Sequence, residues 1–272
     1  MVKIEKVKFR KILNSAGKIS LEVEITDCDG IKAFASTPSA IQPGKREVTS
    51  IPSFYHNYIN DLIEEICNID IGSQKILDTI LNKYMKKIGA DICLSLSLAF
   101  ARIMAQKEQI SLVEYIAKIA NYKTRYISPK PLVTIFSGGV HNTKSKGTLQ
   151  NIMLSVNIQP FSKAITPILE IYTDIEKQLK QMNLLKGYGS SSGMLVDSIT
   201  TEEKFKMVFD SIKKLGYEKH VTIAIDVAAE HLFENDTYTY QGEKITSEQF
   251  SKILAKYKKN YPLTFIEDPF AP

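Results

Sequence analysis

The stretch VTIAIDVAAE at residues 221–230 and the stretch YPLTFIEDPF at residues 261–270 decide the predicted fold of the second half of the chain. Each contains an apolar run without alternation that ends in an acid, Asp226 in the first and Glu267 in the second. Such runs are typical of buried strands, and a stretch with helical periodicity, residues 247–259, lies between them. Strand, helix and strand in this order predict a unit of an α/β barrel.

The two acids point to chemistry as well as to topology. The carboxyl ends of parallel strands meet at one rim of a barrel, so Asp226 and Glu267 are expected to converge there. Carboxylate oxygens are the ligands that Mg2+ prefers in proteins. The residues alone leave a second interpretation open, in which both acids are strand-end carboxylates that cap helices.

Composition places the chain among ordinary globular proteins. It has 272 residues, of which 44% are hydrophobic and 24% are charged, enough for one large domain or two smaller ones. Thirty-five basic residues are scattered among 30 acidic ones, so the net charge of +5 indicates a solvated surface. No basic run is interleaved with aromatic residues, and we expect no nucleic-acid partner.

Cysteine usage and the N-terminus indicate a cytoplasmic protein. Cys28, Cys67 and Cys93 are far apart and odd in number, which predicts neither a zinc site nor a disulfide framework. The first residues, MVKIEKVKFRKIL, lack the apolar core of a secretory signal. No apolar run reaches the length of a membrane span, so no membrane association is expected.

The first part of the chain predicts an α+β domain over residues 1–128. Alternating segments within residues 1–36 indicate a three-stranded antiparallel meander. Residues 55–119 place apolar side chains at helical spacing, and the segment 90–108 is apolar on nearly every face, which predicts a buried central helix. Ser111 stands at an N-cap position, with Glu114 placed to complete a capping box.

The second part, residues 129–272, predicts a partial α/β (TIM-type) barrel. It contains about four barrel-type strands, whereas a closed barrel needs eight. The sequence is therefore expected to be a fragment, one half of a split protein, or a protein whose half-barrel is covered by a partner or by itself. The predicted elements before the two acid-tipped strands are strands at 131–137 and 149–160, helices at 162–182 and 201–215, and a glycine/serine loop at 187–200.

Five motifs, in the same order along the chain, resemble the enolase (phosphopyruvate hydratase) family. They are KILNSAGKISLEVEI, IGADICLSLSLAFARI, SGGVHNTKSKGTLQNIML, AIDVAAEHLF and YPLTFIEDPF. The resemblance covers essentially the whole chain. It implies an α+β N-terminal domain, a barrel domain, Mg2+ as cofactor, dimers, and the glycolytic dehydration of 2-phosphoglycerate to phosphoenolpyruvate.

The resemblance also implies roles for single residues. Asp226 and Glu267 match metal ligands of the family, and His141 matches an active-site histidine. Gln150 matches the glutamine of a Gln-Glu pair whose acid is Asn151 in this chain. The catalytic glutamate of a glycine-rich loop is replaced by Ser191, and the metal-binding serine of a mobile loop is replaced by Gln42.

These replacements predict an active site that lacks some of its catalytic groups. Neither Asn151 nor Ser191 titrates near neutral pH, and loss of a general acid or base costs about 10²- to 10⁴-fold in rate. The third metal carboxylate, the catalytic lysine and the phosphate-holding residues of the family have no match within the chain. We expect this polypeptide alone to be inactive.

Three hypotheses follow. The chain is an enolase that needs a complementary C-terminal half, or an enolase-like binding or regulatory subunit without hydratase activity. The third is a related lyase that acts on another carboxylate substrate.

Overall fold

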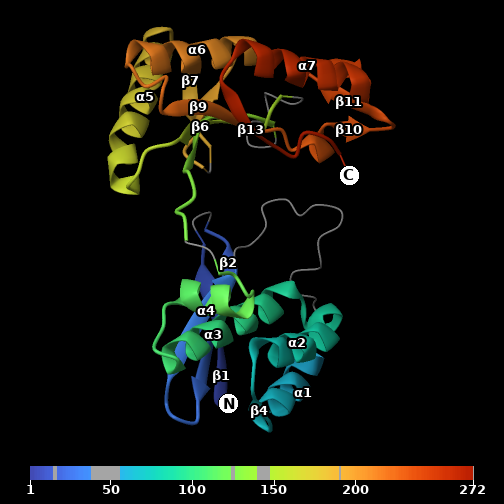
Figure 1. The fold of residues 1–272 in the computed structure, drawn as a ribbon. Helices are drawn as coiled ribbons and strands as arrows, with labels where there is room; N and C mark the ends of the chain where they lie inside the picture. The colour runs from blue at the N-terminus through green and yellow to red at the C-terminus, as the bar shows by residue number, and fades with distance from the viewer. Residues whose placement is uncertain (15–16, 38–55, 124–125, 140–147, 190, 272) are drawn as a thin grey trace. The chain divides into compact units, whose positions relative to one another are not determined.

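The computed structural model describes residues 1–14, 17–37, 56–123, 126–139, 148–189 and 191–271. The chain divides into two compact units, Met1–Tyr126 and Ile127–Pro272, and each is described by itself (Figure 1). In the described residues, no helix has the length and apolar character that crossing a membrane requires.

The first unit is built on the predicted antiparallel meander, which the structure confirms. Its strands are β1 (Val2–Leu13), β2 (Ile19–Asp27) and β3 (Lys32–Thr37), and the short β4 (Asp70–Ile71) joins them in the order β3-β2-β1-β4. The alternating apolar side chains of these strands form the core under the helices, and their inward members include Val2, Ile4, Val23, Ile25, Ala33 and Ala35.

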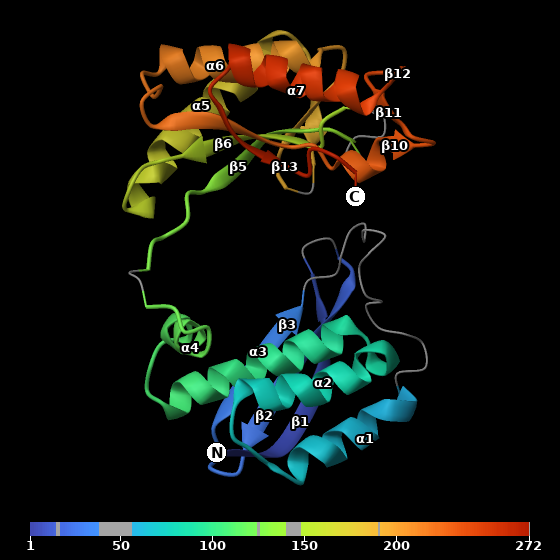
Figure 2. The ribbon, with the colours of Figure 1, turned by 45° about the vertical axis from the view of Figure 1, so that its right-hand side comes forward.

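Four helices complete the first unit (Figure 2). They are α1 (His56–Cys67), α2 (Gln74–Ile88), α3 (Ala90–Lys107) and α4 (Leu112–Ile119). The predicted central helix is α3, which packs on β2 and β3, although Leu94 on its outer face is half exposed. The predicted capping box is present: Glu114 N donates to Ser111 Oγ, and Glu114 Oε2 accepts from Ser111 N.

The second unit is a six-stranded mixed sheet in the order β13-β9-β6-β5-β8-β7. Strand β6 runs antiparallel to β5 and β9, and β7 runs antiparallel to β8, whereas β5 with β8 and β9 with β13 are parallel. Strands β7 and β13 are the edges, so the sheet is open within the described residues. The strands are β5 (Leu132–Ser137), β6 (Asn151–Val156), β7 (Leu185–Tyr188), β8 (Met194–Val196), β9 (Val221–Asp226) and β13 (Leu263–Glu267).

Three helices cover one face of this sheet: α5 (Phe161–Gln181), α6 (Thr201–Lys214) and α7 (Ser247–Asn260) (Figure 1). Helix α6 contacts β9 and α7 contacts β13. The core between the two layers takes Ile152, Leu154 and Val156 from β6 and Val221, Ile223 and Ile225 from β9. Because side chains alternate along a strand, the intervening residues of β6 and β9 point to the face away from the helices.

The structure corrects the prediction that both acid-tipped strands are fully buried. Strand β9 is buried, but in β13 only Leu263 is buried, and Phe265 is 42% exposed. The physical reason is that β13 is an edge strand with β9 as its one neighbour, so an apolar run does not guarantee cover on every side.

Two further features were not predicted. The segment 187–200, predicted as a glycine/serine loop, contains the end of β7 and all of β8. Residues 233–245 form a small meander of β10 (Phe233–Glu234), β11 (Thr237–Tyr240) and β12 (Glu243–Ile245). This meander is held by aromatic packing, since Tyr238 stacks on Phe250 of α7 with ring centroids 4.8 Å apart. The 3-10 turn η2 (Ala229–His231) precedes it.

Candidate functional site

Four polar residues lie in one row across the sheet of the second unit. Ser137 is the register partner of Asn151, Asn151 is the partner of Asp226, and Asp226 is the partner of Glu267. Side chains at directly opposed positions of adjacent strands point to the same face. The four residues therefore form a polar row at one end of β5, β6, β9 and β13, on the face away from the helices. We call it the rim row.

The carboxylate of Asp226 is held by donors on both oxygens. Gln150 Nε2 donates to Oδ2 over 3.0 Å, and Ala228 N donates to Oδ1 over 3.0 Å. Ala228 lies in the left-handed region, with φ at 45°. Burial raises the pKa of Asp226, while the hydrogen bonds from Ala228 and Gln150 act in the opposite direction. The structure thus places the predicted residue Gln150 directly beside Asp226.

Glu267 stands beside Asp226 at the edge of the sheet. The backbones beyond β9 and β13 are tied together, because Val227 N donates to the carbonyl of Glu267 over 3.0 Å. Desolvation raises the pKa of Glu267, and the negative charges of Asp226 and Asp268 raise it further. Among the described residues, neither Asp226 nor Glu267 has a salt bridge, and hydrogen bonds from Gln150 and Ala228 compensate the charge of Asp226.

This carboxylate pair fits a hard cation in part. Paired oxygens with raised pKa values are relieved by a nearby positive charge. The residues that the structure describes contain no group of three or more His, Cys, Asp or Glu side chains placed to hold a metal. Asp226 and Glu267 therefore supply two oxygen ligands, and further ligands must come from other kinds of group or from water.

The glycine-rich loop reaches the other end of the rim row. Ser191 Oγ lies 3.4 Å from Ser137 Oγ, which in turn lies 3.5 Å from Asn151 Oδ1. The loop packs against β5 so tightly that a Cβ on Gly193 would lie 2.2 Å from Ser137 Oγ. The predicted site residue Ser191 is thus linked to the row through Ser137, which the sequence analysis did not single out. Its signal was its place at a strand end directly before Gly138-Gly139.

The remaining predicted site residues, His141 and Gln42, lie outside the described residues. Their roles stay predictions.

Family models match both parts of the chain. Residues 4–116 match the enolase N-terminal domain, and residues 125–272 match the enolase C-terminal TIM barrel domain. Among curated relatives, the enolase of Elusimicrobium minutum is 26% identical over 289 residues, which are 99% of this chain and 67% of that protein. The enolase of Ehrlichia ruminantium is 28% identical, with 99% and 68% covered.

A third relative, the enolase of Beutenbergia cavernae, is 26% identical over 100% of this chain and 67% of its own length. The chain thus spans about two thirds of the length of these relatives. The two family models follow each other as the α+β unit and the sheet-and-helix unit do in the structure. The chain belongs to the enolase family.

Proposed function

We propose that this chain supplies part of an Mg2+-dependent enolase-type site, which dehydrates 2-phosphoglycerate to phosphoenolpyruvate together with a complementary C-terminal segment. The observation that carries the proposal is the register pair of Asp226 and Glu267 at the ends of two parallel strands. Its carboxylates have no salt-bridge partner among the described residues. We further propose a cytoplasmic location and a homo-oligomeric state.

Asp226 and Glu267 are the residues that would hold the metal, with Gln42 as a weaker candidate. Bound Mg2+ supplies charge stabilisation for a substrate carboxylate that becomes a dianion when its neighbouring carbon loses a proton. Gln150 keeps Asp226 in place through its 3.0 Å hydrogen bond. His141, in the segment of the sequence that follows β5, is proposed as a substrate contact.

Apart from its two carboxylates, the rim row contains no side chain that could transfer a proton in the reaction. Asn151 is an amide, and Ser137 and Ser191 are hydroxyls, so they can donate hydrogen bonds but do not titrate near neutral pH. The sheet also has open edges at β7 and β13 within the described residues, whereas the barrel of the matching family domain is closed by further strands. Both features support a complementary segment that brings the base and covers β13.

A second candidate function is that of a binding or regulatory subunit without hydratase activity. The amide of Asn151 and the hydroxyl of Ser191 favour it, because they stand in the rim row and its adjoining loop without proton-transfer capacity. Such a subunit would keep the carboxylate pair and bind a phosphorylated acid without turnover.

A turnover assay separates these functions. The purified chain is mixed with Mg2+ and 2-phosphoglycerate, alone and with the part of the Elusimicrobium minutum enolase that this chain does not cover. We expect no enol product from the chain alone and measurable product from the mixture. Product from the chain alone at ordinary enolase rates would contradict the proposal. Binding of 2-phosphoglycerate without product in either arm would favour the binding subunit.

A further inference from the structure

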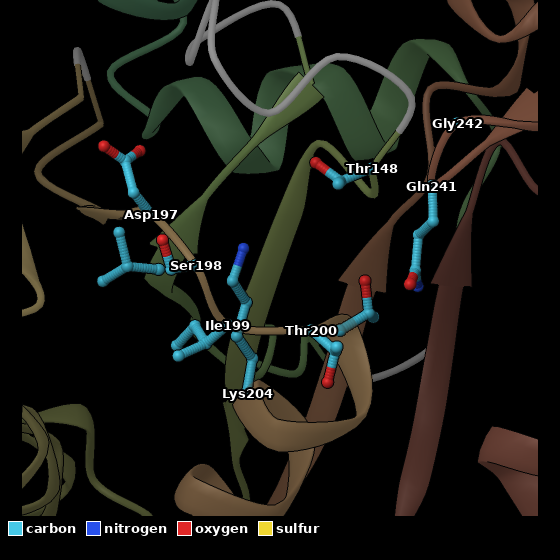
Figure 3. A pocket seen from close by; sticks show the side chains of 10 residues that line it. Thr148, Asp197, Ser198, Ile199, Thr200, Lys204, Gln241 and Gly242 are labelled. Atoms are coloured by element: carbon cyan, nitrogen blue, oxygen red, sulfur yellow. The ribbon is translucent and has the colours of Figure 1, made fainter.

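A polar cavity lies beside the N-terminus of α6, apart from the two rim carboxylates. It has a volume of about 570 Å³ and is lined by Val196 to Thr201, Lys204, Thr148 and the turn at Gln241 and Gly242 (Figure 3). None of Asn151, Asp226 and Glu267 lines it. Its hydroxyl and amide side chains come from three separate segments of the second unit.

The decisive group in this cavity is the ammonium of Lys204. The residue is 5% exposed, and Figure 3 shows its nitrogen directed into the cavity, between Ser198 and Thr148. Within the described part of the chain, this ammonium makes neither a salt bridge nor a hydrogen bond, and its one electrostatic partner is Asp197. A buried cation without a close partner is costly in free energy, so the arrangement calls for an anion.

The N-terminus of helix α6 adds hydrogen-bond donors that also favour a negative charge. Its capping box uses the N–H groups of Thr200 and Glu203, since Thr200 N donates to Glu203 Oε2 and Glu203 N donates to Thr200 Oγ1. The intervening N–H groups, of Thr201 and Glu202, have no partner inside the helix because they belong to its first turn. The positive end of the helix dipole lies at the same place.

The acids near this helix end are engaged elsewhere. The carboxylate of Glu203 is occupied by the capping box. Glu202 accepts from Tyr261 Oη over 2.8 Å and lies 3.5 Å from Lys256 Nζ, which holds its charge toward α7 and β13. Among the described residues that line the cavity, Lys204 is the one cationic side chain and Asp197 is the one acidic side chain.

We propose that this cavity is a binding site for a small phosphate-type oxyanion, either inorganic phosphate or the phosphoryl group of a metabolite. One buried ammonium, the first-turn amides of a helix and the hydroxyls of Ser198 and Thr201 are donors that match the several oxygens of such an anion. The site is distinct from the rim carboxylates and independent of turnover there.

Lys204 also lies next to the rim row. A second void, of about 10 Å³, is lined by Lys204 and Thr148 and by Ser137, the first member of the row. The anion site and the enolase-type site are thus neighbours that share one wall.

The test measures binding of inorganic phosphate and of glycerol 3-phosphate by calorimetry at constant ionic strength, with acetate as a carboxylate arm. We expect phosphate to bind the wild-type chain and to bind Lys204→Met about tenfold or more weakly, the loss typical of a hydrogen-bonded charge. The matched control is Lys206→Met, whose ammonium is exposed on the same helix and pairs with Asp210. Tighter binding of glycerol 3-phosphate than of phosphate would identify a metabolite as the source of the anion.

A second measurement keeps the inference testable if the variant folds poorly. Lysines of the wild-type chain are methylated reductively, and the rate at each lysine is read by mass spectrometry with and without phosphate. We expect phosphate to slow methylation of Lys204 and to leave Lys206 unchanged. Equal phosphate binding by Lys204→Met and wild type, or unchanged methylation of Lys204, would overturn the proposal.

Discussion

At the scale of single residues, the rim row holds two carboxylates at positions where ionising either one lowers the stability of the fold. Asp226 is 8% exposed, and its burial and the charge of Asp268 raise its pKa above the ordinary 3.8. Desolvation and the charges of Asp226 and Asp268 raise the pKa of Glu267 above the ordinary 4.5. A group whose folded-state pKa is raised destabilises the fold when it is ionised. Without a cation, this destabilisation is absent below the ordinary pKa and is complete above the raised pKa.

A magnesium titration at several pH values tests whether the ionised carboxylates destabilise the fold until a cation binds them. We expect Mg2+ to raise the melting temperature at neutral pH, and the rise to shrink as the pH falls through the raised pKa values, because protonated carboxylates do not bind the ion. Asp226→Asn and Glu267→Gln are expected to abolish the rise and, without Mg2+, to melt no lower than wild type.

The matched control for this titration is Glu248→Gln, which removes an exposed carboxylate on α7 that pairs with Lys252. It is expected to keep the full response to Mg2+. A response that survives in both rim variants would place the ion elsewhere in the chain.

At the scale of elements, the glycine-rich loop and β5 are fitted to each other. Gly189 N donates to the carbonyl of Gly193 over 2.8 Å, which closes the loop, and Gly193 lies directly on Ser137. A Cβ at Gly193 would also approach Ser137 N to 3.0 Å, a backbone atom that cannot rotate away. Strand β5 and the loop therefore hold Ser137 and Ser191 together only if position 193 has no side chain.

Gly193→Ala tests this fit. We expect it to lower the free energy of unfolding of the second unit by about 1–3 kcal/mol, the usual cost of an overpacked methyl group. The measurement is urea unfolding followed by tyrosine fluorescence. Gly72→Ala is the control, because its Cβ would meet only Ile76 Cδ1 at an ordinary 3.7 Å. Equal changes in the free energy of unfolding for the two substitutions would show that the loop can shift to accommodate the added methyl group.

Periodicity predicted the long elements because each carries its own pattern. The meander β1 to β3 and the helices α5, α6 and α7 all bury one regular stripe of apolar residues, which sequence spacing records directly. Strands β7 and β8 were missed because they are four and three residues long and flank a glycine/serine turn. Too few positions remain there for a pattern.

The site was less predictable than the fold, because the environment of its residues depends on which elements pack beside them. The pairing of Asp226 with Glu267 could be expected from two strand ends, but the exposure of β13 depends on which strand lies beside it. Lys204 stands in TEEKFKMVFDSIKK, where a lysine is indistinguishable from the solvated ones around it. Only the packing of α6 against the end of β5 shows that its ammonium is buried.

At the scale of the whole molecule, the second unit has an open edge strand, β13, with which another chain could pair. Phe265 of the edge strand β13 is 42% exposed, and Leu263 of the same strand belongs to the core. Edge strands with apolar side chains and open backbone groups pair readily with another chain. The proposed homo-oligomer and the proposed complementary segment would both cover β13, so they should compete for it.

Light scattering after size-exclusion chromatography tests this competition. We expect the chain alone to form an oligomer, and Phe265→Lys to shift it toward monomer, because a charge on the edge strand opposes strand pairing. Leu169→Lys, at a residue 57% exposed on helix α5 of the same unit, is the control and is expected to leave the mass unchanged. If the complementary enolase segment converts the oligomer to a one-to-one complex while Phe265→Lys blocks that complex, β13 is the shared surface. An oligomer that withstands both changes would be built on another face, and the edge would then have no part in assembly.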